Sequence, residues 1–373
     1  MTSFTRTDTS MLGRWWWTVD RWTLAAVAIL VGFGILLTLA ATPSVALNLK
    51  YDAFHFVRRQ FMFLPLALMV LLGVSLLSPR GVFRVTLVVL VISLTCVFAT
   101  FWIGAEIKGA QRWINLGVVS LQPSEFVKPT LAVVAAWFFA AARTDLWRFG
   151  NVAAIALFGI VASLLILQPD VGMAFIVSAA WFCQFLLAGL SLQWAVLFAV
   201  LGIVAMVGAY LLLPHVASRV DRFLDPSVGD NYQVERSLEA FMSGGMFGRG
   251  PGEGTVKWVL PDAHADFVFA VVGEELGMLA CLVIVVLFAF VVLRGFTRAL
   301  QENNLFIMLA ASGLLVQFGL QAAVNMSSAL RLMPAKGMTL PFISYGGSSL
   351  LSTGLTVGLL LALTRRRFGE GSG

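Results

Sequence analysis

Long runs of apolar residues without any acidic or basic charge dominate the pattern of the chain. A membrane-spanning helix needs about 20 such residues, so each run predicts at least one span. The runs cover residues 22–49, 60–79, 85–105, 149–169, 171–218, 276–293, 305–330 and 337–364. The 171–218 run is long enough for two helices and divides best at Gly189-Leu190-Ser191.

A further span is predicted at 129–142, which is too short unless residues 121–128 extend it. This extension brings Glu125 and Lys128 into the membrane. The sequence thus predicts an all-α integral membrane protein, with about ten helices in a single polytopic domain, 1–373. An even number of helices places both termini on the same side of the membrane.

The composition agrees with this class and excludes others. The chain is 59% hydrophobic and only 12% charged, whereas a soluble protein carries about 25% charge. The net charge of +6 is spread over loops without a basic tract, so nucleic acid is not expected as a partner. Cys96, Cys183 and Cys281 all lie in apolar runs, at spacings that fit neither a metal site nor a disulfide framework.

The distribution of Lys and Arg predicts the orientation. With cytoplasmic termini, 12 of the 25 basic residues lie inside, and 5 of the other 13 lie in the long 214–264 segment. The positive-inside rule applies to short loops, so this segment is set aside and the balance favours cytoplasmic termini. The predicted topology has cytoplasmic tails at 1–21 and 365–373 and a large extracytoplasmic loop at 214–264.

Eight basic residues remain outside, where insertion disfavours them. They are Lys50, Arg58, Arg59, Lys108, Arg112, Lys128, Arg331 and Lys336. Their position suggests an anionic ligand on the external face. The competing explanation is that long basic side chains reach lipid phosphates at the interface, which suits Arg58 and Arg59 better than Arg112.

The external loop has two distinct parts. Residues 231–242 (NYQVERSLEAFM) place apolar side chains three and four positions apart, which predicts a short helix lying on the membrane. The next stretch, GGMFGRGPGEG (244–254), holds six glycines and a proline and predicts an irregular loop whose backbone can approach a ligand closely. No Walker pattern is present, so a nucleotide site is not expected.

Residues 260–277, LPDAHADFVFAVVGEELG, place carboxylates at the start of the eighth span. An ionised carboxylate in hydrocarbon costs roughly 2.5–3.5 kcal/mol, so such groups need partners or water. In a continuous helix from 266, Glu274 lies about 80° around the axis from Asp266 and Glu275 about 180°. We interpret the two glutamates as interhelical polar contacts, with catalysis as the alternative, and Asp266 as a carboxylate at the membrane–water boundary. Asp170, in LQPDVG, is interpreted as a helix cap.

One carboxylate beside external cations suits glycosyl transfer from a sugar diphosphate. A base deprotonates the acceptor hydroxyl, and positive groups hold the departing diphosphate. Because diphosphate is already a good leaving group, the second, protonated carboxyl of a glycosidase is dispensable. A positioned base contributes on the order of 10²–10⁴ in rate.

Six stretches resemble the SEDS family of bacterial cell-wall proteins (shape, elongation, division and sporulation). They are GAQRWINLG (109–117), QPSEFVKP (122–129), QPDVG (168–172), GGMFGRGPGEG (244–254), LPDAHADFVFAVVGEELG (260–277) and PAKGMTLPFISYGGSSLL (334–351). They follow the family order over nearly the whole chain. VVGEELG and KGMTLPFISYGGSSL resemble the division branch, FtsW, more than the elongation branch, RodA.

Two positions depart from the family pattern. Ala265 stands where Thr is usual, so a hydroxyl beside Asp266 is not required here. Arg236 stands where Gln is common and adds an external cation, which either helps to hold phosphate or is merely exposed.

The resemblance implies a ten-helix peptidoglycan glycosyltransferase of the bacterial inner membrane, which polymerises lipid II at the division septum. It implies that Asp266 is the general base. The substrate-binding candidates are Arg112, Trp113, Glu125, Lys128, His264, Lys336 and Ser344. Glu274, Glu275 and Asp170 are expected in supporting roles.

The resemblance also implies partners. These are a class B penicillin-binding protein of the FtsI type and the divisome regulators FtsQ, FtsL, FtsB and FtsN. A divalent cation, Mg²⁺ or Mn²⁺, is an open expectation at the diphosphate, and no protein-held metal ligands are assigned. Two other functions stay open: a lipid II flippase, and a divisome scaffold without activity.

Overall fold

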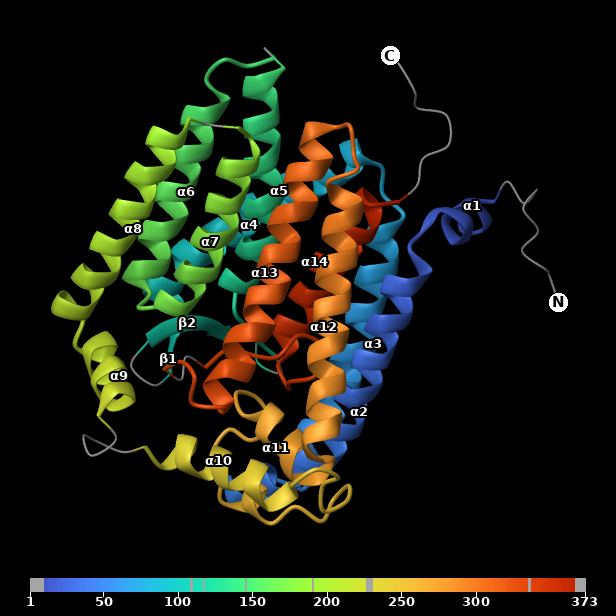
Figure 1. The fold of residues 1–373 in the computed structure, drawn as a ribbon, viewed down its shortest axis with the longest axis vertical. Helices are drawn as coiled ribbons and strands as arrows, with labels where there is room; N and C mark the ends of the chain where they lie inside the picture. Colours follow the sequence, from blue (N-terminus) through green and yellow to red (C-terminus); the bar gives the residue numbers. More distant parts are fainter. Residues whose placement is uncertain are drawn as a thin grey trace.

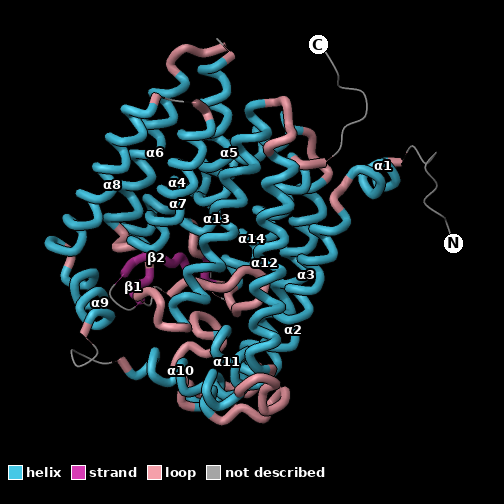
Figure 2. The backbone as a smooth tube through the Cα atoms, viewed as in Figure 1, coloured by secondary structure: helices cyan, strands magenta, loops and turns pink. Residues whose placement is uncertain are grey.

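The structure is a computed structural model that describes residues 10–107, 110–115, 117, 119–144, 146–189, 191–225, 231–334 and 337–365. Helices dominate, with one small antiparallel sheet of order β1-β2-β3 (Figures 1 and 2). The helices are α1 (Met11–Thr18), α2 (Arg21–Asn48), α3 (His55–Ser75), α4 (Pro79–Ile103), α5 (Ser124–Arg143), α6 (Gly150–Leu167), α7 (Val171–Leu187), α8 (Leu192–Leu212), α9 (Pro214–Leu224), α10 (Tyr232–Gly244), α11 (Val268–Glu275), α12 (Gly277–Ala299), α13 (Leu305–Ala329) and α14 (Gly347–Leu363), with a 3₁₀ turn at Val256–Trp258. The strands are β1 (Ala105–Ile107), β2 (Ala110–Asn115) and β3 (Ser120–Leu121).

The predicted all-α membrane fold is confirmed in the described part of the chain. Eight helices are long and apolar enough to cross a membrane. Two more apolar helices, α7 and α14, have 17 residues each, which is about the shortest length that spans. Together they occupy the positions of the ten predicted spans, including α5, which carries Glu125 and Lys128 as expected.

Three helices form the centre of the bundle. In α5 and α13 the most apolar window is 78% and 67% buried, against 6% in α8, and α14 is buried along nearly its whole length. Two glycines allow α14 to approach α3 closely, because a Cβ at Gly354 or Gly358 would lie 2.5 Å from Ala67 O or 2.8 Å from Leu71 O. Such small residues drive close helix packing in membranes.

A proline inside α5 is compensated by its neighbours. Pro129 has no N–H, so the carbonyl of Glu125 loses its helical partner. The hydroxyl of Ser352 in α14 donates to that oxygen at 2.6 Å. Gln317 of α13 donates to a second carbonyl of this turn, Lys128 O, at 2.8 Å. These bonds satisfy backbone groups that have no access to bulk water, and they fix the first turn of α5 against α13 and α14.

The eighth span differs from the prediction of one helix starting at 266. Asp266 lies in turns before α11, and the helix breaks between α11 and α12 at Gly277, whose φ is +80°. A Cβ at Gly277 would lie 2.4 Å from Gly248 N, so the glycine-rich loop packs directly against the break. The predicted 80° and 180° placements of the glutamates therefore do not apply.

The last span is also shorter than predicted, since α14 starts at Gly347 and not at 337. Residues 338–346 form an irregular segment that lies beside the turns around Asp266. The backbone N–H of Tyr345 donates to His264 O at 2.9 Å. This non-helical segment therefore forms backbone hydrogen bonds within the protein, as irregular backbone between membrane helices must.

The lower end of the bundle in Figure 1 carries α9, α10, α11 and the sheet. The short helix expected at 231–242 is confirmed as α10, but its apolar face packs on α11, with Phe241 against Phe269 at 5.7 Å between ring centroids. At the opposite end Arg298 joins Asp20, before α2, to the carbonyl of Thr364, after α14. The first and last spans thus begin and end on the same side.

Candidate functional site

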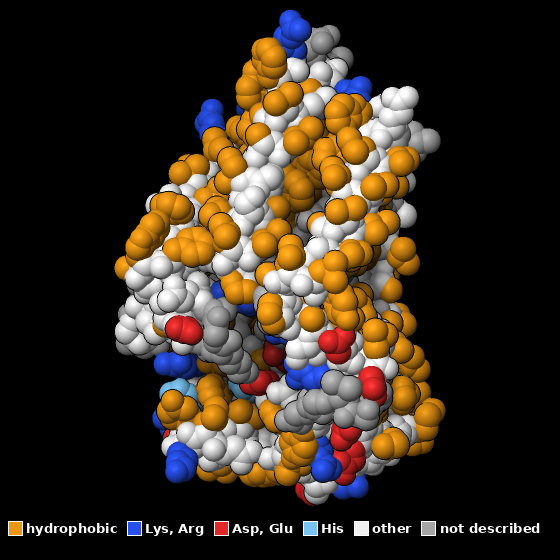
Figure 3. All heavy atoms as spheres, turned by 90° about the vertical axis from the view of Figure 1, so that its left-hand side faces the viewer, with side chains coloured by type: hydrophobic (Ala, Val, Ile, Leu, Met, Phe, Trp, Pro, Cys, Tyr) orange, Lys and Arg blue, Asp and Glu red, His pale blue; other side chains and the backbone are white. Residues whose placement is uncertain are grey.

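A cavity of about 1060 Å³ opens at the end of the bundle that carries α9, α10 and the sheet, and it collects most of the charged candidates. Its lining holds six basic residues and four acidic ones. They are Arg59, Arg112, Lys128, Arg219, Arg222 and Arg331, with Glu125, Asp170, Asp262 and Asp266. On the face drawn in Figure 3, apolar side chains cover the upper part of the molecule, and charged side chains gather around a recess below them. The excess of positive charge favours an anionic ligand.

Asp266 is fixed in this cavity through its backbone. Three consecutive carbonyl oxygens each accept a hydrogen bond from another segment: His264 O from Tyr345 N at 2.9 Å, Ala265 O from Ser344 Oγ at 2.6 Å, and Asp266 O from Asn325 Nδ2 at 2.9 Å. The 338–346 segment and α13 therefore fix the position of the Asp266 backbone, from which its side chain extends.

The Asp266 carboxylate faces the backbone at Gly337. A Cβ built on Gly337 would lie 3.2 Å from Asp266 Oδ2, and the φ of Gly337 is +62°. Glycine is favoured here for two reasons: the conformation is left-handed, and a Cβ would press against the carboxylate.

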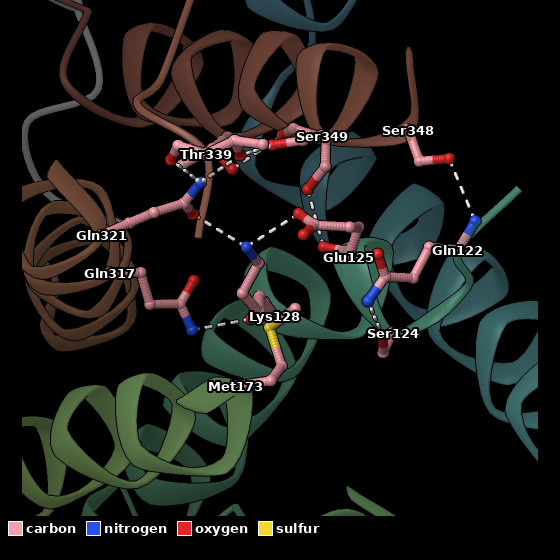
Figure 4. A network of polar contacts seen from close by, with 12 residues as sticks. Gln122, Ser124, Glu125, Lys128, Met173, Gln317, Gln321, Thr339, Ser348 and Ser349 are labelled. Carbon is pink, nitrogen blue, oxygen red and sulfur yellow. Dashed lines mark hydrogen bonds and ion pairs between the residues drawn. The ribbon is translucent and has the colours of Figure 1, made fainter. Parts of the chain in front are cut away.

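Lys128 lies between two acceptors at the inner end of the cavity (Figure 4). Its ammonium is 2.8 Å from Glu125 Oε2 and 2.8 Å from Gln321 Oε1. Gln321 in turn donates to the carbonyl and hydroxyl of Thr339, at 3.0 and 3.2 Å. The network connects α5, α13 and the segment after Gly337, and it pairs Glu125 with Lys128, a contact that was not predicted from the sequence.

Arg112 and Trp113 both line the cavity from β2. Arg112 donates to Gln168 O at 2.9 Å and to Pro169 O, and its guanidinium lies 3.5 Å from Asp170 Oδ1. Asp170 also accepts from Met173 N at 3.3 Å, so its predicted role as the cap of α7 is confirmed. The sheet that positions Arg112 was not expected from the sequence.

The remaining substrate-binding candidates fall in different places. His264 lines the cavity and packs between Phe56 and Tyr345, with ring centroids at 4.9 and 5.1 Å. Ser344 does not line it: its hydroxyl accepts from Leu340 N at 2.7 Å and donates to Ala265 O. The structure therefore gives Ser344 a supporting place and not a substrate contact. Lys336 lies outside the described residues.

The two glutamates of VVGEELG bind the loop at 252–257, which corrects the expectation of contacts between helices. Glu274 accepts from the backbone N–H groups of Thr255, Val256 and Lys257, at 2.6, 2.7 and 3.1 Å. Glu275 accepts from Gly252 N at 3.0 Å and forms an ion pair with Lys257. Both side chains are buried and neither lines the cavity, so their supporting role stays a prediction that this placement is consistent with.

Several cavity residues were missed from the sequence. Gln317, Gln321 and Asn325 recur every four residues along one face of the predicted span 305–330, which is a signal for a polar lining that the sequence analysis did not use. Arg219 and Arg222 were counted only as charges of the long loop.

Comparison with known proteins decides the family. The family model for the cell cycle proteins FtsW, RodA and SpoVE matches residues 21–368. The chain belongs to this family. The FtsW/RodA/SpoVE resemblance of the six stretches is thereby confirmed over nearly the full chain.

Individual relatives agree with this family. A protein of Caulobacter vibrioides named "Probable peptidoglycan glycosyltransferase FtsW" is 42% identical over 98% of this chain and 94% of its own. One of the same name from Alkalilimnicola ehrlichii is 36% identical over 95% and 92%.

Solved structures share the FtsW/RodA/SpoVE fold. A chain of a peptidoglycan synthase complex, described for the structural coordination of polymerization and crosslinking, has a TM-score of 0.75 and 28% identity, over 93% of this chain and 97% of that one. The rod shape determining protein RodA of Thermus thermophilus has a TM-score of 0.69 and 28% identity, over 94% and 97%.

Proposed function

We propose that this protein is a peptidoglycan glycosyltransferase of the FtsW type, which polymerises lipid II into β-1,4 glycan strands during septal wall synthesis. The observation that carries the proposal is that Asp266, Arg112 and Lys128 line one external cavity. The names of the relatives, at up to 42% identity over nearly the full length, support the same activity.

The geometry suggests the following reaction. Asp266 takes the proton of the acceptor GlcNAc 4-hydroxyl as its oxygen attacks the anomeric carbon of the donor MurNAc. The bond from that carbon to the diphosphate breaks, with inversion, and the polyprenyl diphosphate leaves. Arg112 supplies positive charge for the leaving group, and Lys128 does so from the inner end of the cavity.

We propose that a divalent cation, Mg²⁺ or Mn²⁺, if one takes part, is bound by the diphosphate of the substrate and not by the protein. Two of the four cavity carboxylates already have basic partners, since Asp170 lies against Arg112 and Glu125 against Lys128. The described residues contain no group of three His, Cys, Asp or Glu side chains that would hold a metal. These side chains do not make a protein-held cation site, so no step depends on one.

The partner and location belong to the same proposal. One structural neighbour is part of a peptidoglycan synthase complex, which supports a class B penicillin-binding protein of the FtsI type as the partner. We place the protein at the septum of the inner membrane, with cytoplasmic termini and FtsQ, FtsL, FtsB and FtsN as regulators. The apolar helices support a multi-pass membrane protein.

Polymerisation by purified protein tests the proposal. Wild type and Asp266→Asn are reconstituted with labelled lipid II, each with and without the cognate penicillin-binding protein, and glycan chains are separated by length. We expect chains from wild type and a loss of about 10²–10⁴-fold in the variant, which keeps the size of the side chain but not the base. Wild-type rates from Asp266→Asn would overturn the base assignment.

The two other functions give different results in the same samples. A flippase would move lipid II between leaflets of a liposome without making polymer. An inactive scaffold would support division equally well with Asp266→Asn, in a strain that depends on this protein.

A further inference from the structure

Helix α9 presents two arginines to the cavity that the proposed reaction has not used. Arg219, Arg222 and Phe223 all line the cavity, and their spacing of three and four residues places them on one face of α9. Helix α9 follows α8 directly, and Tyr210 of α8 donates to Asp221 of α9 at 2.9 Å. This hydrogen bond to the end of α8 helps to set which face of α9 points toward the cavity.

Arg219 differs from the cavity cations that already have partners. Arg112 is held by Asp170 and two carbonyls, and Lys128 by Glu125 and Gln321. Within the described part of the chain Arg219 makes no hydrogen bond or ion pair, and Arg222 donates only to Ser218 O in its own helix. Both guanidinium groups thus keep donors available.

Like charges converge around Arg219. Partial shielding from water inside the cavity lowers the pKa of Arg219, the positive charges of Arg112 and Arg222 lower it further, and the charges of Asp170 and Asp266 raise it. Positive groups repel one another unless an anion lies between them, so this arrangement favours a multiply charged ligand.

We propose that Arg219 and Arg222 of α9, together with Arg112 of β2, form the site that holds the diphosphate of the lipid-linked donor. Guanidinium groups bind phosphate oxygens through paired N–H donors, which suits them to this ligand better than an ammonium. The inference rests on the proposed function for the identity of the donor. It adds a binding site for the leaving group on an element other than those that carry Asp266 and Lys128.

The placement of α9 sets this site apart from the packed centre of the bundle. Helix α8 is the least buried span, and among the other described elements it packs mainly on α7 and α9. Figure 1 shows α9 at the lower end of α8, beside the sheet. The two arginines therefore lie on an arm that is separate from the packed centre formed by α5, α13 and α14.

Binding, measured separately from turnover, tests the site. Wild type, Arg219→Ala, Arg222→Ala and the double variant are placed in nanodiscs of zwitterionic lipid and titrated with undecaprenyl diphosphate. We expect the double variant to bind about 10–100-fold more weakly and to raise the KM for lipid II. Arg219→Lys should fall between wild type and Arg219→Ala, because it keeps the charge and loses the paired donors.

Arg236→Ala is the matched control. Arg236 also lies in the external loop, but it pairs with Glu239, stacks on Tyr232 and does not line the cavity. Of the two explanations for this residue, the structure supports simple exposure. Its removal should leave diphosphate binding unchanged, which separates a local site from a general loss of positive charge.

Each result supports or overturns the inference. Wild-type affinity in the folded double variant would overturn it, even if both proteins make glycan. Weaker binding in the double variant would support it, even if neither protein makes glycan and the proposed function is wrong. Adding phosphatidylglycerol to the nanodiscs tests whether the arginines prefer the diphosphate over an ordinary lipid phosphate. If phosphatidylglycerol displaces undecaprenyl diphosphate at equal concentration, the arginines only bind lipid headgroups at the interface, and the proposed site is wrong.

Discussion

Asn325 of α13 donates a 2.9 Å hydrogen bond to the backbone carbonyl of Asp266. The same amide nitrogen also donates to Met338 O at 2.5 Å, and the side chain is 1% exposed. Asn325 therefore joins the turn that carries the proposed base to the segment that follows Gly337. Its role is to position Asp266, since its side chain bonds backbone oxygens.

Removal of this amide should impair chemistry more than binding. We expect Asn325→Leu to lower the kcat of lipid II polymerisation by about 10–100-fold with a smaller effect on KM, because a misplacement of about 1 Å can cost about 100-fold. Steady-state kinetics on protein of verified thermal stability measures the two constants separately.

Gln184→Leu provides the control for a lost buried amide. Gln184 is fully buried and also donates from one nitrogen to two carbonyls, Ala132 O at 2.7 Å and Leu309 O at 3.0 Å, but it does not line the cavity. Its variant should lose stability and keep kcat. If both variants lose kcat to the same degree, the positioning role of Asn325 is wrong.

Gly337→Ala should displace the Asp266 carboxylate. The added Cβ would lie 3.2 Å from Oδ2 and would also adopt a φ of +62°, which costs roughly 1–2 kcal/mol for an L residue. Gly189→Ala is the control, because its φ is +71° and the nearest atom to the new Cβ, Arg143 Nη2, lies 3.9 Å away. We expect similar shifts in melting temperature and a fall in polymerisation for Gly337→Ala alone. Equal activity of the two variants would contradict contact with Asp266.

The sequence predicted the spans and most of the site because hydropathy and charge are local signals. Uncharged runs identify spans regardless of how helices pack, and ionisable groups near such runs need a cavity or partners. Asp266, Arg112, Glu125 and Lys128 could be selected on that basis.

Contacts between distant segments explain what was mispredicted. The helix break at Gly277 depends on Gly248, 29 positions earlier, whose backbone would meet a Cβ there. Glu274 and Glu275 appeared to need other helices as partners, yet backbone N–H groups of the loop bind them. Periodicity assigns a face to a side chain but does not say which chain segment will cover it.

Asp20 makes stability depend on acid pH at the opposite end of the bundle. Its carboxylate is 2% exposed and accepts from Arg294 at 2.7 and 3.0 Å, with Arg298 at 3.0 Å. Burial raises its pKa, but the hydrogen bonds from Arg294 and Thr23 and the charges of Arg298 and Arg294 lower it below the ordinary 3.8 in sum.

The sign of this shift determines the pH range of the effect. Because the folded-state pKa is lowered, the stabilisation is complete above about pH 4 and is lost as the pH falls through the folded value. Asp20→Asn should destabilise the protein by about 1–3 kcal/mol at pH 7. The difference in melting temperature from wild type should stay constant from pH 8 to 5 and shrink below pH 4. A difference that grows on acidification would contradict the ion pairs.

Glu125 and Lys128 form a buried ion pair whose two possible roles can be separated. Their side chains are 10% and 6% exposed, so removal of one partner leaves an uncompensated charge and should cost about 3–5 kcal/mol. We expect Lys128→Met and Glu125→Leu each to lower the melting temperature, and the double variant to recover most of the loss because no charge is left alone. If Lys128 also supplies charge to the diphosphate, the recovered double variant still polymerises lipid II at least about 10-fold more slowly than wild type. Recovery of both stability and rate would show that the pair only supports the fold.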